Sequence, residues 1–250
     1  MLADIHTTED AALGGRLVLR QPKRGHRFGH DAILLAAAVD ARAGEIAVDL
    51  GAGVGTAGLA LAHRVPGLNV RLVEVDATLA GLAQQNATCN KLAERVSVTA
   101  ADVEDPDAFG QLNLSGVDHV LMNPPFNDPI NVSPDAARRR AHVADAGALA
   151  RWVDCAAALL GPGGTLTMIW RAAGLAEVLG ALGGGFGGIT VLPIHPKPAA
   201  PAIRILVRAV RRSGAPLSML PPLALNDADG RPSAQAEAVL RGGMSLPMTA

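Results

Sequence analysis

Aromatic residues are scarce in this chain of 250 residues, which has four phenylalanines, two tryptophans and no tyrosine. Its core must therefore consist mainly of alanine, leucine and valine, and hydrophobic residues of all kinds still make up 49% of the sequence. Only 18% of the residues are charged. This composition excludes a disordered chain and, with this length and no linker along the sequence, predicts a single domain over residues 1–250.

Cysteine, net charge and long apolar runs are also lacking. The two cysteines, Cys89 and Cys155, lie in Ala-rich stretches without metal-ligand spacing, which predicts no metal site and no disulfide framework. The formal net charge is -1, so any affinity for nucleic acid must come from local clusters of basic residues. No apolar stretch reaches the ~18 residues of a membrane span, and the acidic N-terminus is unlike a signal peptide. We therefore expect a cytoplasmic protein with no membrane contact.

What the sequence does contain is an alternation of short β-branched runs with Ala/Leu-rich segments of helical length. The expected strands are 45–50, 70–75, 96–99, 117–122, 165–170, 189–194 and 202–210. The expected helices are 30–39, 56–65, 78–90, 144–160 and 172–182. This pattern is typical of an α/β, Rossmann-like fold with a doubly wound, mostly parallel seven-stranded sheet and helices on both faces. Because only a proline-rich connection joins the last two strands, we expect an antiparallel edge strand.

A glycine-rich turn follows the first expected strand. It begins at Asp49 and contains Gly51, Gly53 and Gly55, which allow a ligand to approach the backbone closely. Glu74 follows about twenty residues later, where a ribose-binding carboxylate is expected. The turn suits NAD or S-adenosylmethionine, or it is purely structural. Asp49 favours S-adenosylmethionine, because its carboxylate would repel a pyrophosphate and attract an ammonium or sulfonium.

Two further turns follow the third and fourth expected strands. Asp102 comes after the third strand, where its carboxylate can accept a hydrogen bond from an adenine amine or serve as a helix cap or turn residue. The sequence Asn123-Pro124-Pro125-Phe126 comes after the fourth strand. Because ligands bind at the carboxyl ends of strands in doubly wound sheets, both turns are candidates for the same site.

The residues of the second turn suit methyl transfer to a planar nitrogen. The lone pair of such an amine is delocalised, and acceptors directed at its two hydrogens can hold the lone pair toward a methyl donor. Asn123 supplies a side-chain oxygen and Pro124 a main-chain carbonyl, while Pro125 stiffens the turn. Phe126 can stack on a flat substrate. The alternative is a structural turn with Phe126 in the core.

These turns, in this order, resemble the class I S-adenosylmethionine-dependent methyltransferases of the amino-methylating group, over about residues 16–210. The resemblance implies that the Asp49–Gly55 loop and Glu74 hold the methionine and ribose of the cofactor. It also implies that Asp102 holds the adenine amine. Asn123 borders both ligands, and Asn123–Phe126 as a whole holds the substrate amine.

A narrower resemblance lies in residues 21–35, which begin Gln21-Pro22-Lys23-Arg24. They are similar to the N-terminal signature of bacterial enzymes that methylate the adenine N6 beside the anticodon of valine tRNA. This resemblance implies that residues 1–44 form a helical and basic extension over the cofactor site, with Phe28 and Asp31 at the methionine end. His30 is either a general base or a capping or packing residue, since the chemistry does not require a base.

Clusters of basic residues flank the proposed pocket in the sequence and suit RNA phosphates, although exposed arginines that only contact water are the alternative. The residues expected to bind RNA are Lys23, Arg24, Arg27, Arg138, Arg139 and Arg140. The sequence thus predicts an adenine-N6 methyltransferase that acts on tRNA. Other interpretations are a protein glutamine-N5 or rRNA guanine-N2 methyltransferase, or a module that binds a nucleotide cofactor without catalysis.

Overall fold

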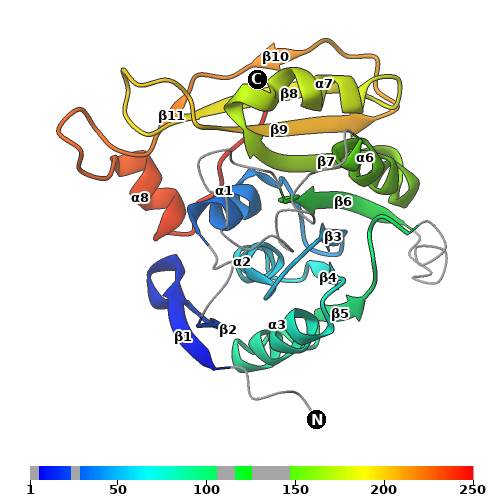
Figure 1. Ribbon diagram of the computed structural model, residues 1–250, viewed down its shortest axis with the longest axis vertical. Coiled ribbons are helices and arrows are strands. Elements are labelled where there is room, and N and C mark those ends of the chain that lie inside the picture. Colours follow the sequence, from blue (N-terminus) through cyan, green and yellow to red (C-terminus); the bar gives the residue numbers. More distant parts are fainter. Residues whose placement is uncertain (1–5, 24–28, 106–115, 126–146, 250) are drawn as a thin grey trace, which may run out of the picture.

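The computed structural model describes residues 6–23, 29–105, 116–125 and 147–249, and its centre is one mixed sheet with helices on both faces (Figure 1). Across the sheet, the main strands are β5 (Val96–Ala100), β4 (Asn69–Glu74), β3 (Ile46–Leu50), β6 (Val117–Met122), β7 (Leu160–Arg171), β9 (Arg204–Arg211) and β8 (Phe186–His195). The helices are α1 (His30–Ala38), α2 (Thr56–Arg64), α3 (Ala77–Cys89), α6 (Ala148–Leu159), α7 (Leu175–Leu182) and α8 (Ala234–Leu240).

The expected α/β architecture is confirmed. Strands β5, β4, β3, β6 and β7 are parallel, and β9 is antiparallel to both of its neighbours. The antiparallel strand lies one position inside the expected edge, because β8 pairs with its outer side. Two short strands, β10 (Ser218–Met219) and β11 (Leu223–Ala224), pair with β8 in parallel and extend the sheet. The strand order reverses between β3 and β6, and this switch point is where ligands bind in such sheets.

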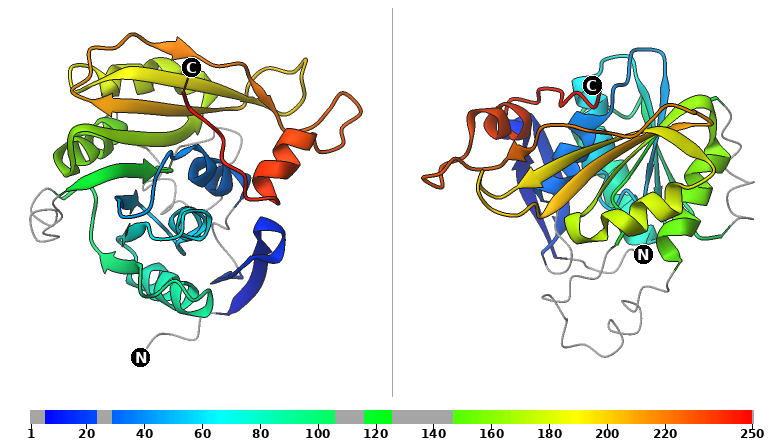
Figure 2. Two further views of the ribbon diagram at one scale, coloured as in Figure 1. Left: turned by 180° about the vertical axis from the view of Figure 1, so that it is seen from behind. Right: turned by 90° about the horizontal axis from the view of Figure 1, so that it is seen from above.

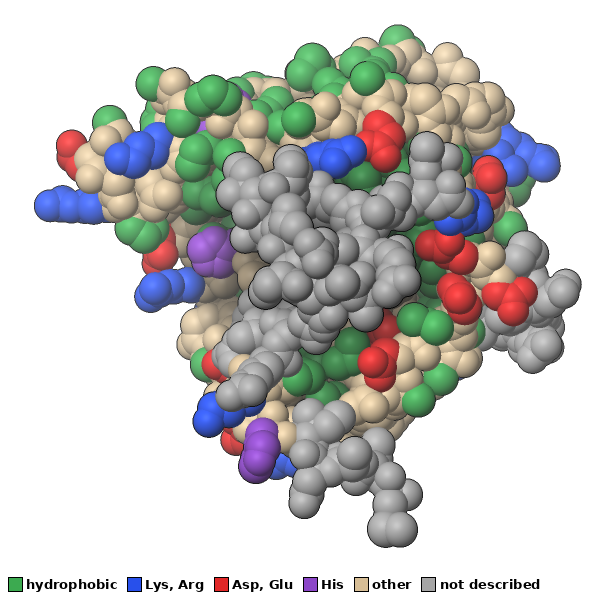
Figure 3. Space-filling model, viewed as in Figure 1, with side chains coloured by type: hydrophobic (Ala, Val, Ile, Leu, Met, Phe, Trp, Pro, Cys, Tyr) green, Lys and Arg blue, Asp and Glu red, His purple; other side chains and the backbone are tan. Residues whose placement is uncertain are grey.

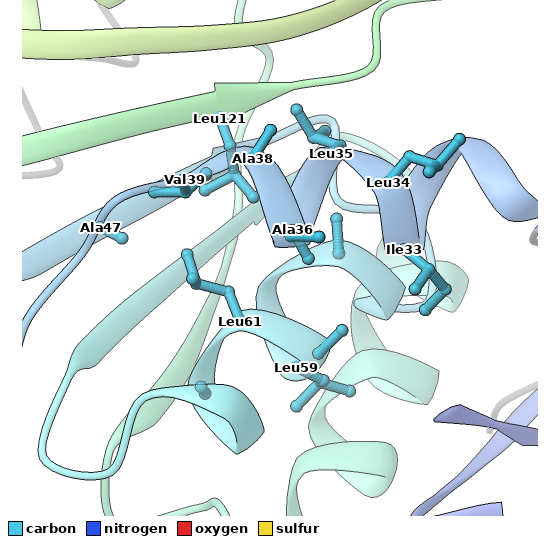
Figure 4. Close-up of a cluster of buried hydrophobic side chains, with 14 of the residues drawn as sticks. Ile33, Leu34, Leu35, Ala36, Ala38, Val39, Ala47, Leu59, Leu61 and Leu121 are labelled. Atoms are coloured by element: carbon cyan, nitrogen blue, oxygen red, sulfur yellow. The ribbon is translucent and has the colours of Figure 1, made fainter. Parts of the chain in front are cut away.

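Helices lie on both faces of the sheet (Figure 2), and two clusters of buried apolar side chains hold them against it. Helices α1 and α2 share one cluster of buried side chains, in which Ile33 and Ala36 lie near Leu59 and Leu61 (Figure 4). Every residue of α1 from Ile33 onward is buried, as expected for a helix without a polar face. Helices α6 and α7 cover the other face of the sheet. Among the described helices, none is both long and apolar enough to cross a membrane.

A β-hairpin that the sequence analysis did not predict precedes α1. Strands β1 (Thr7–Ala12) and β2 (Leu17–Pro22) pair antiparallel around the 3-10 turn η1 (Leu13–Gly15). The sequence predicts a helical N-terminal extension, and this prediction is incomplete. The extension contains this hairpin as well as α1, and the hairpin lies beside α3 (Figure 1).

Side-chain amides of α3 complete the free edge of β2. Asn90 exchanges hydrogen bonds of 3.0 and 2.8 Å with the N–H and carbonyl of Val18, and Asn86 does the same with Arg20 at 2.8 and 3.0 Å. Asn86 also donates to the carbonyl of Val54 at 3.0 Å. This buried amide therefore ties the hairpin to the glycine-rich turn.

Candidate active site

The glycine-rich turn joins β3 to α2 at the carboxyl edge of the sheet. Gly51 and Gly53 have φ angles of 66° and 58°, in the left-handed region that favours glycine. A Cβ at Gly51 would lie 2.4 Å from the ring of Trp152, whereas a Cβ at Gly53 would meet no described atom within 4 Å. The turn is therefore packed against α6 on one side and open at Gly53, where a ligand can approach the backbone.

The wall beneath Gly51 was not found from the sequence. Trp152 on α6 contributes the ring, and its Nε1 donates to Glu104 at 3.3 Å. Glu104 follows β5 and also pairs with Arg151 at 2.6 Å. These contacts join segments 47 and 48 residues apart, so no local pattern could have indicated them.

Glu74, at the end of β4, is buried and holds the glycine-rich turn in place. Its Oε2 accepts from the N–H of Gly53 at 2.7 Å, and its Oε1 accepts from the N–H of Asp76 at 2.9 Å. Each carboxylate oxygen can accept a further hydrogen bond. The position therefore suits the predicted role of accepting hydroxyl hydrogens from a ribose.

Asp49, on β3, lies beneath the same turn and is 2% exposed. Its Oδ2 accepts from the N–H of Gly58 at 2.8 Å. This bond caps α2, whose N-cap residue Gly55 has no side chain for that purpose. Burial raises the pKa of Asp49 to about 7, the Gly58 bond opposes that rise, and the charge of Glu74 adds to it. Two carboxyl groups under one turn favour a cationic ligand above it.

Asp102 lies beside Glu74, because the neighbouring Ala101 donates from its N–H to the carbonyl of Glu74 at 3.1 Å. The carboxylate of Asp102 is exposed and accepts from the N–H of Glu104 at 2.9 Å, so it acts as a turn residue, which was the alternative to adenine binding. Its exposure leaves it accessible to a ligand as well. Val75, directly after Glu74, is 63% exposed at the same edge and was not singled out in the sequence.

The Asn123 turn begins where β6 ends. Met122 pairs with Leu50 of β3, so Asn123 follows β6 at the level where Gly51 follows β3. Pro124 is buried and Pro125 is exposed. The Oδ1 of Asn123 is buried and has no hydrogen-bond partner among the described residues. Buried polar atoms are rarely left unpaired, so this acceptor fits a donor supplied by a ligand.

The start of α1 brings Asp31 to the same side of the sheet. Its Oδ2 accepts from Nε of Arg204 at 2.9 Å, and Arg204 begins β9 next to the carboxyl end of β7. His30 is the exposed first residue of α1, after a Gly29 N-cap with no capping side chain. Lys23 is exposed at the end of the hairpin.

Several expected site residues lie outside the described part of the chain. They are Arg24, Arg27, Phe28, Phe126, Arg138, Arg139 and Arg140. The structure brings together the others: the glycine-rich turn, Glu74, Asp102 and Asn123 all lie at the carboxyl ends of neighbouring strands, with Asp49 immediately below.

This donor and acceptor set suits S-adenosylmethionine better than NAD. The carboxyl groups of Asp49 and Glu74 favour a ligand with positive charge and ribose hydroxyls, and they would repel a pyrophosphate beside the turn. The open side of Gly53 leaves room for that ligand against the backbone. The unpaired Oδ1 of Asn123 then offers an acceptor for the hydrogens of a second ligand.

Comparison with known proteins gives a family. The model of the family described as "Methyltransferase small domain" matches residues 27–195. Curated relatives include two proteins named tRNA1(Val) (adenine(37)-N6)-methyltransferase. The one from Porphyromonas gingivalis W83 is 31% identical over 147 residues, 57% of this chain and 58% of the relative. The one from Trichodesmium erythraeum is 27% identical over 202 residues, 79% of this chain and 82% of the relative. The match to the first of them thus spans little more than half of its length.

Solved structures agree with the fold. A structure from Agrobacterium tumefaciens, described as a predicted O-methyltransferase, has a TM-score of 0.75 at 29% identity and covers 88% of this chain and 100% of that chain. TrmN from Thermus thermophilus has a TM-score of 0.52 at 22% identity, covering 73% of this chain and 48% of that chain, and shows the fold alone.

Proposed function

Because the chain belongs to the methyltransferase small domain family, we propose that it transfers a methyl group from S-adenosylmethionine to the exocyclic N6 amine of an adenine in tRNA. The observation that carries this proposal is the buried, unpaired Oδ1 of Asn123 beside the glycine-rich turn. A buried acceptor without a donor costs about 1–3 kcal/mol. An amine hydrogen of the substrate would remove that cost.

The residues of the β3–β4 half of the edge would hold the cofactor. Glu74 would accept the ribose hydroxyls, Asp102 the adenine amine, and the side of Gly53 that is open would face the ligand. Asp31 would face the methionine end, next to Arg204. The bound cofactor supplies an electrophilic methyl group on a sulfonium.

Asn123 and Pro124 would orient the amine. Two acceptors, the Oδ1 of Asn123 and the carbonyl of Pro124, would hold the two amine hydrogens so that the nitrogen lone pair is directed at the methyl group. The buried Pro124 and the following Pro125 restrict the backbone, which keeps both acceptors in place. The methylated nitrogen is cationic and loses its proton readily, so no general base is needed, and His30 has no required role in the chemistry.

Oxygen methylation, which the description of the Agrobacterium structure names, is the second candidate because that structure matches most of this chain. Methylation of a hydroxyl is assisted by a base that removes its proton. An amide oxygen such as that of Asn123 is too weak a base for this role, whereas it is well suited to accept a hydrogen bond from an amine. The Asn123 turn therefore favours nitrogen as the methyl acceptor.

Support for tRNA comes from the relatives, whose names state that they act on adenine 37 of tRNA1(Val). The six basic residues expected from the sequence would contact phosphates, and of these Lys23 is exposed at the end of the hairpin, on the segment that leads to α1. Replacing Arg138, Arg139 and Arg140 with alanine should weaken binding of tRNA. It should also make the slope of log affinity against log salt concentration less steep, by about 0.9 for each lost phosphate contact. An unchanged slope would remove these three residues from the proposed interface.

The deciding experiment is mass spectrometry of nucleosides from unmodified tRNA incubated with the protein and isotopically labelled cofactor. Labelled N6-methyladenosine is the expected product, and it should be absent with Asn123→Ala. Label in guanosine, in a hydroxyl group or in glutamine of an added release factor would identify one of the other substrates. Binding of the cofactor without transfer to any of these acceptors would favour a binding module.

A further inference from the structure

A cavity lies away from the glycine-rich turn, between residues of the hairpin tip, α1, α2 and the end of α8. Its volume is about 220 Å³. From α2 it is lined by Ala60, His63 and Arg64, in the second half of the helix, whereas the glycine-rich turn joins the start of that helix. The two ends of α2 are eight residue steps apart, or about 12 Å at about 1.5 Å per residue.

The polar lining of this cavity is basic. Arg16 from the hairpin tip reaches it together with His63 and Arg64, and none of the described residues that line it is acidic. The nearby carboxylates do not line it: Asp40 lines a smaller neighbouring cavity, and Glu237 pairs with Arg241 at the end of α8. Burial lowers the pKa of Arg64, and the charge of Asp40 partly opposes this effect. Figure 3 shows Lys and Arg side chains on the α8 side of this face and acidic side chains mainly on the side of β5.

Both arginines are held in place by the ends of helices. The Nη2 of Arg64 donates to the carbonyls of Ala36, at 2.9 Å, and Val39 at the end of α1. The Nη1 of Arg16 donates to the carbonyl of Gly242 after α8. These contacts use only part of each guanidinium, which has five N–H donors. The cations are thus positioned before any ligand arrives.

Arg64 also has an unexplained atom. Its Nε is buried and has no hydrogen-bond partner among the described residues. This atom is too deeply buried to be reached from the cavity, so an anion there would meet the terminal nitrogens of the Arg64 guanidinium. Guanidinium groups bind phosphate oxygens through paired hydrogen bonds, which makes phosphate the best match among common anions.

The rest of the lining is apolar and includes Leu13, Ile33, Val239 and Met244. The cavity is open to solvent on one side, so it can hold a phosphate while the rest of the ligand extends out of it.

We propose that this cavity is a phosphate site, in which Arg16 and Arg64 bind the phosphoryl oxygens of a nucleotide and the apolar wall contacts its sugar. The proposal does not depend on the methyltransferase reaction, because none of its residues belongs to the glycine-rich turn or the Asn123 turn. The phosphate can come from an RNA backbone or from a free nucleotide, and the two sources give different results below.

The test is a titration of the whole protein with inorganic phosphate, followed by the NMR signals of the histidine rings, with sodium chloride at equal ionic strength as the blank. His63 is expected to give a saturable shift, assigned by its loss in His63→Gln. Arg16→Gln should weaken phosphate binding by about tenfold, the equivalent of one charge-assisted hydrogen bond. Arg241→Gln removes the same charge from an exposed residue that does not line the cavity, and should leave the affinity unchanged.

A second pair of variants keeps both arginines. Met244 lines the cavity and is 60% exposed, so Met244→Glu adds a carboxylate there without disturbing the core and should also weaken phosphate binding. Leu217→Glu adds the same charge at an exposed residue near β10 and should have no effect. Absence of a saturable shift in the unmodified protein, or equal affinity in all four variants, would overturn the proposal.

Competition then identifies the source of the phosphate. If a short single-stranded RNA displaces inorganic phosphate and itself binds Arg16→Gln more weakly, the site binds RNA backbone. If adenosine monophosphate displaces it and the RNA does not, the site binds a free nucleotide. Affinity for S-adenosylmethionine, measured separately, should be equal in all these variants. If the unmodified protein binds phosphate but transfers no methyl group, the result would count against the proposed function and not against this site.

Discussion

The two halves of the carboxyl edge differ in how far the protein satisfies its own polar groups. At the end of β4, both oxygens of Glu74 accept backbone N–H groups, and Asp49 beneath the same turn accepts another. At the end of β6, the Oδ1 of Asn123 is buried without a partner among the described residues. The first half is held together by its own hydrogen bonds, whereas the second leaves a buried acceptor for the proposed substrate.

This difference predicts two classes of variant. Substitutions at the β3–β4 half should change the stability of the folded protein together with cofactor affinity, because the same atoms serve both. Substitutions at Asn123 should lower the reaction rate without lowering stability, because no described contact is lost.

The largest expected effect is that of Asn123→Ala on turnover. Removal of an acceptor that orients the reacting amine should lower kcat by about a thousandfold, or about 4 kcal/mol. The affinity for S-adenosylmethionine should stay close to that of the unmodified protein. The midpoint of urea unfolding should stay the same or rise, because the variant loses a buried acceptor that has no partner among the described residues. Single-turnover kinetics with tRNA and calorimetry with the cofactor measure both.

Near-normal turnover in Asn123→Ala would mean that the turn is structural, and it would remove the distinction between the two halves. A loss of stability comparable with the loss of rate would have the same consequence. Asn90→Ala is the matched control, since it removes an amide that binds the hairpin and the carbonyl of Asn86 and should destabilise the protein without a specific effect on kcat.

The second effect concerns Asp49 and pH. Its pKa is raised from 3.8 to about 7 in the folded protein, so the folded state binds a proton that the unfolded state has already released. Stability therefore falls as the pH rises above about 4, and the loss is complete above about 7. Between about pH 5 and about pH 8 this single group should cost about 3 kcal/mol.

Asp49→Asn tests this linkage, because the amide oxygen can still accept from the N–H of Gly58 and carries no charge. Urea unfolding at both pH values should show a fall in stability for the unmodified protein that is smaller by about 3 kcal/mol in the variant. Parallel pH profiles for the two proteins would mean that Asp49 titrates normally. A bound cationic ligand should reduce the slope for the unmodified protein, since it favours the carboxylate.

The sequence predicts the sheet and the edge well because both depend on local patterns. The bounds of β6, residues 117–122, were expected to the residue, since an apolar run ends at a proline pair. The positions of Glu74 and Asn123 at one edge of the sheet were expected because Glu74 ends a strand and Asn123 directly follows one, and parallel strands bring their carboxyl ends together without further information. The order of the last strands could not be predicted, because nothing in the sequence of β9 shows whether it lies at the edge of the sheet or one position inside the edge.

The hairpin and the wall of the site could not be predicted in this way. The outer edge of β2 pairs with two asparagine side chains, those of Asn86 in α3 and Asn90 at its end. Such a pairing leaves no hydrophobic repeat in the sequence by which it could be predicted. Trp152 lies on α6, about a hundred residues from Gly51 in the sequence. Its contact with Gly51 therefore depends on how α6 packs against the sheet. Arg204 meets Asp31 at a separation of 173 residues, and charge alone does not single it out.

The third effect separates the packed side of the glycine-rich turn from its open side. Gly51→Ala has to accommodate a Cβ 2.4 Å from the ring of Trp152, while Gly53→Ala places its Cβ in open space. Both carry the strain of a left-handed alanine, about 1–2 kcal/mol. Gly51→Ala should therefore lose about 2 kcal/mol more stability than Gly53→Ala.

The affinity of these two variants for S-adenosylmethionine should rank in the opposite order: Gly53→Ala should lose more affinity than Gly51→Ala. Gly53→Ala points its methyl group to the side proposed for the ligand, so its affinity should fall by more than its stability accounts for. Thermal unfolding gives the first quantity and calorimetry the second. Equal losses of stability in the two variants would show that Trp152 yields to the added methyl group and does not define the turn.

The smallest expected effect is that of Trp152→Phe, which asks whether the ring or its N–H supports the turn. Phenylalanine keeps an aromatic ring on α6 but removes the 3.3 Å hydrogen bond to Glu104 and the outer carbons of the indole that face Gly51. Because Glu104 retains its ion pair with Arg151, we expect a loss of about 1–2 kcal/mol in stability, the contribution of one hydrogen bond and of the lost packing. Trp152→Ala should cost more, on the order of 3–5 kcal/mol, by opening a larger cavity under Gly51. Urea unfolding of both variants gives the comparison, and a loss in Trp152→Phe as large as in Trp152→Ala would show that the hydrogen bond to Glu104 and the outer part of the indole, and not the inner ring, support this half of the edge.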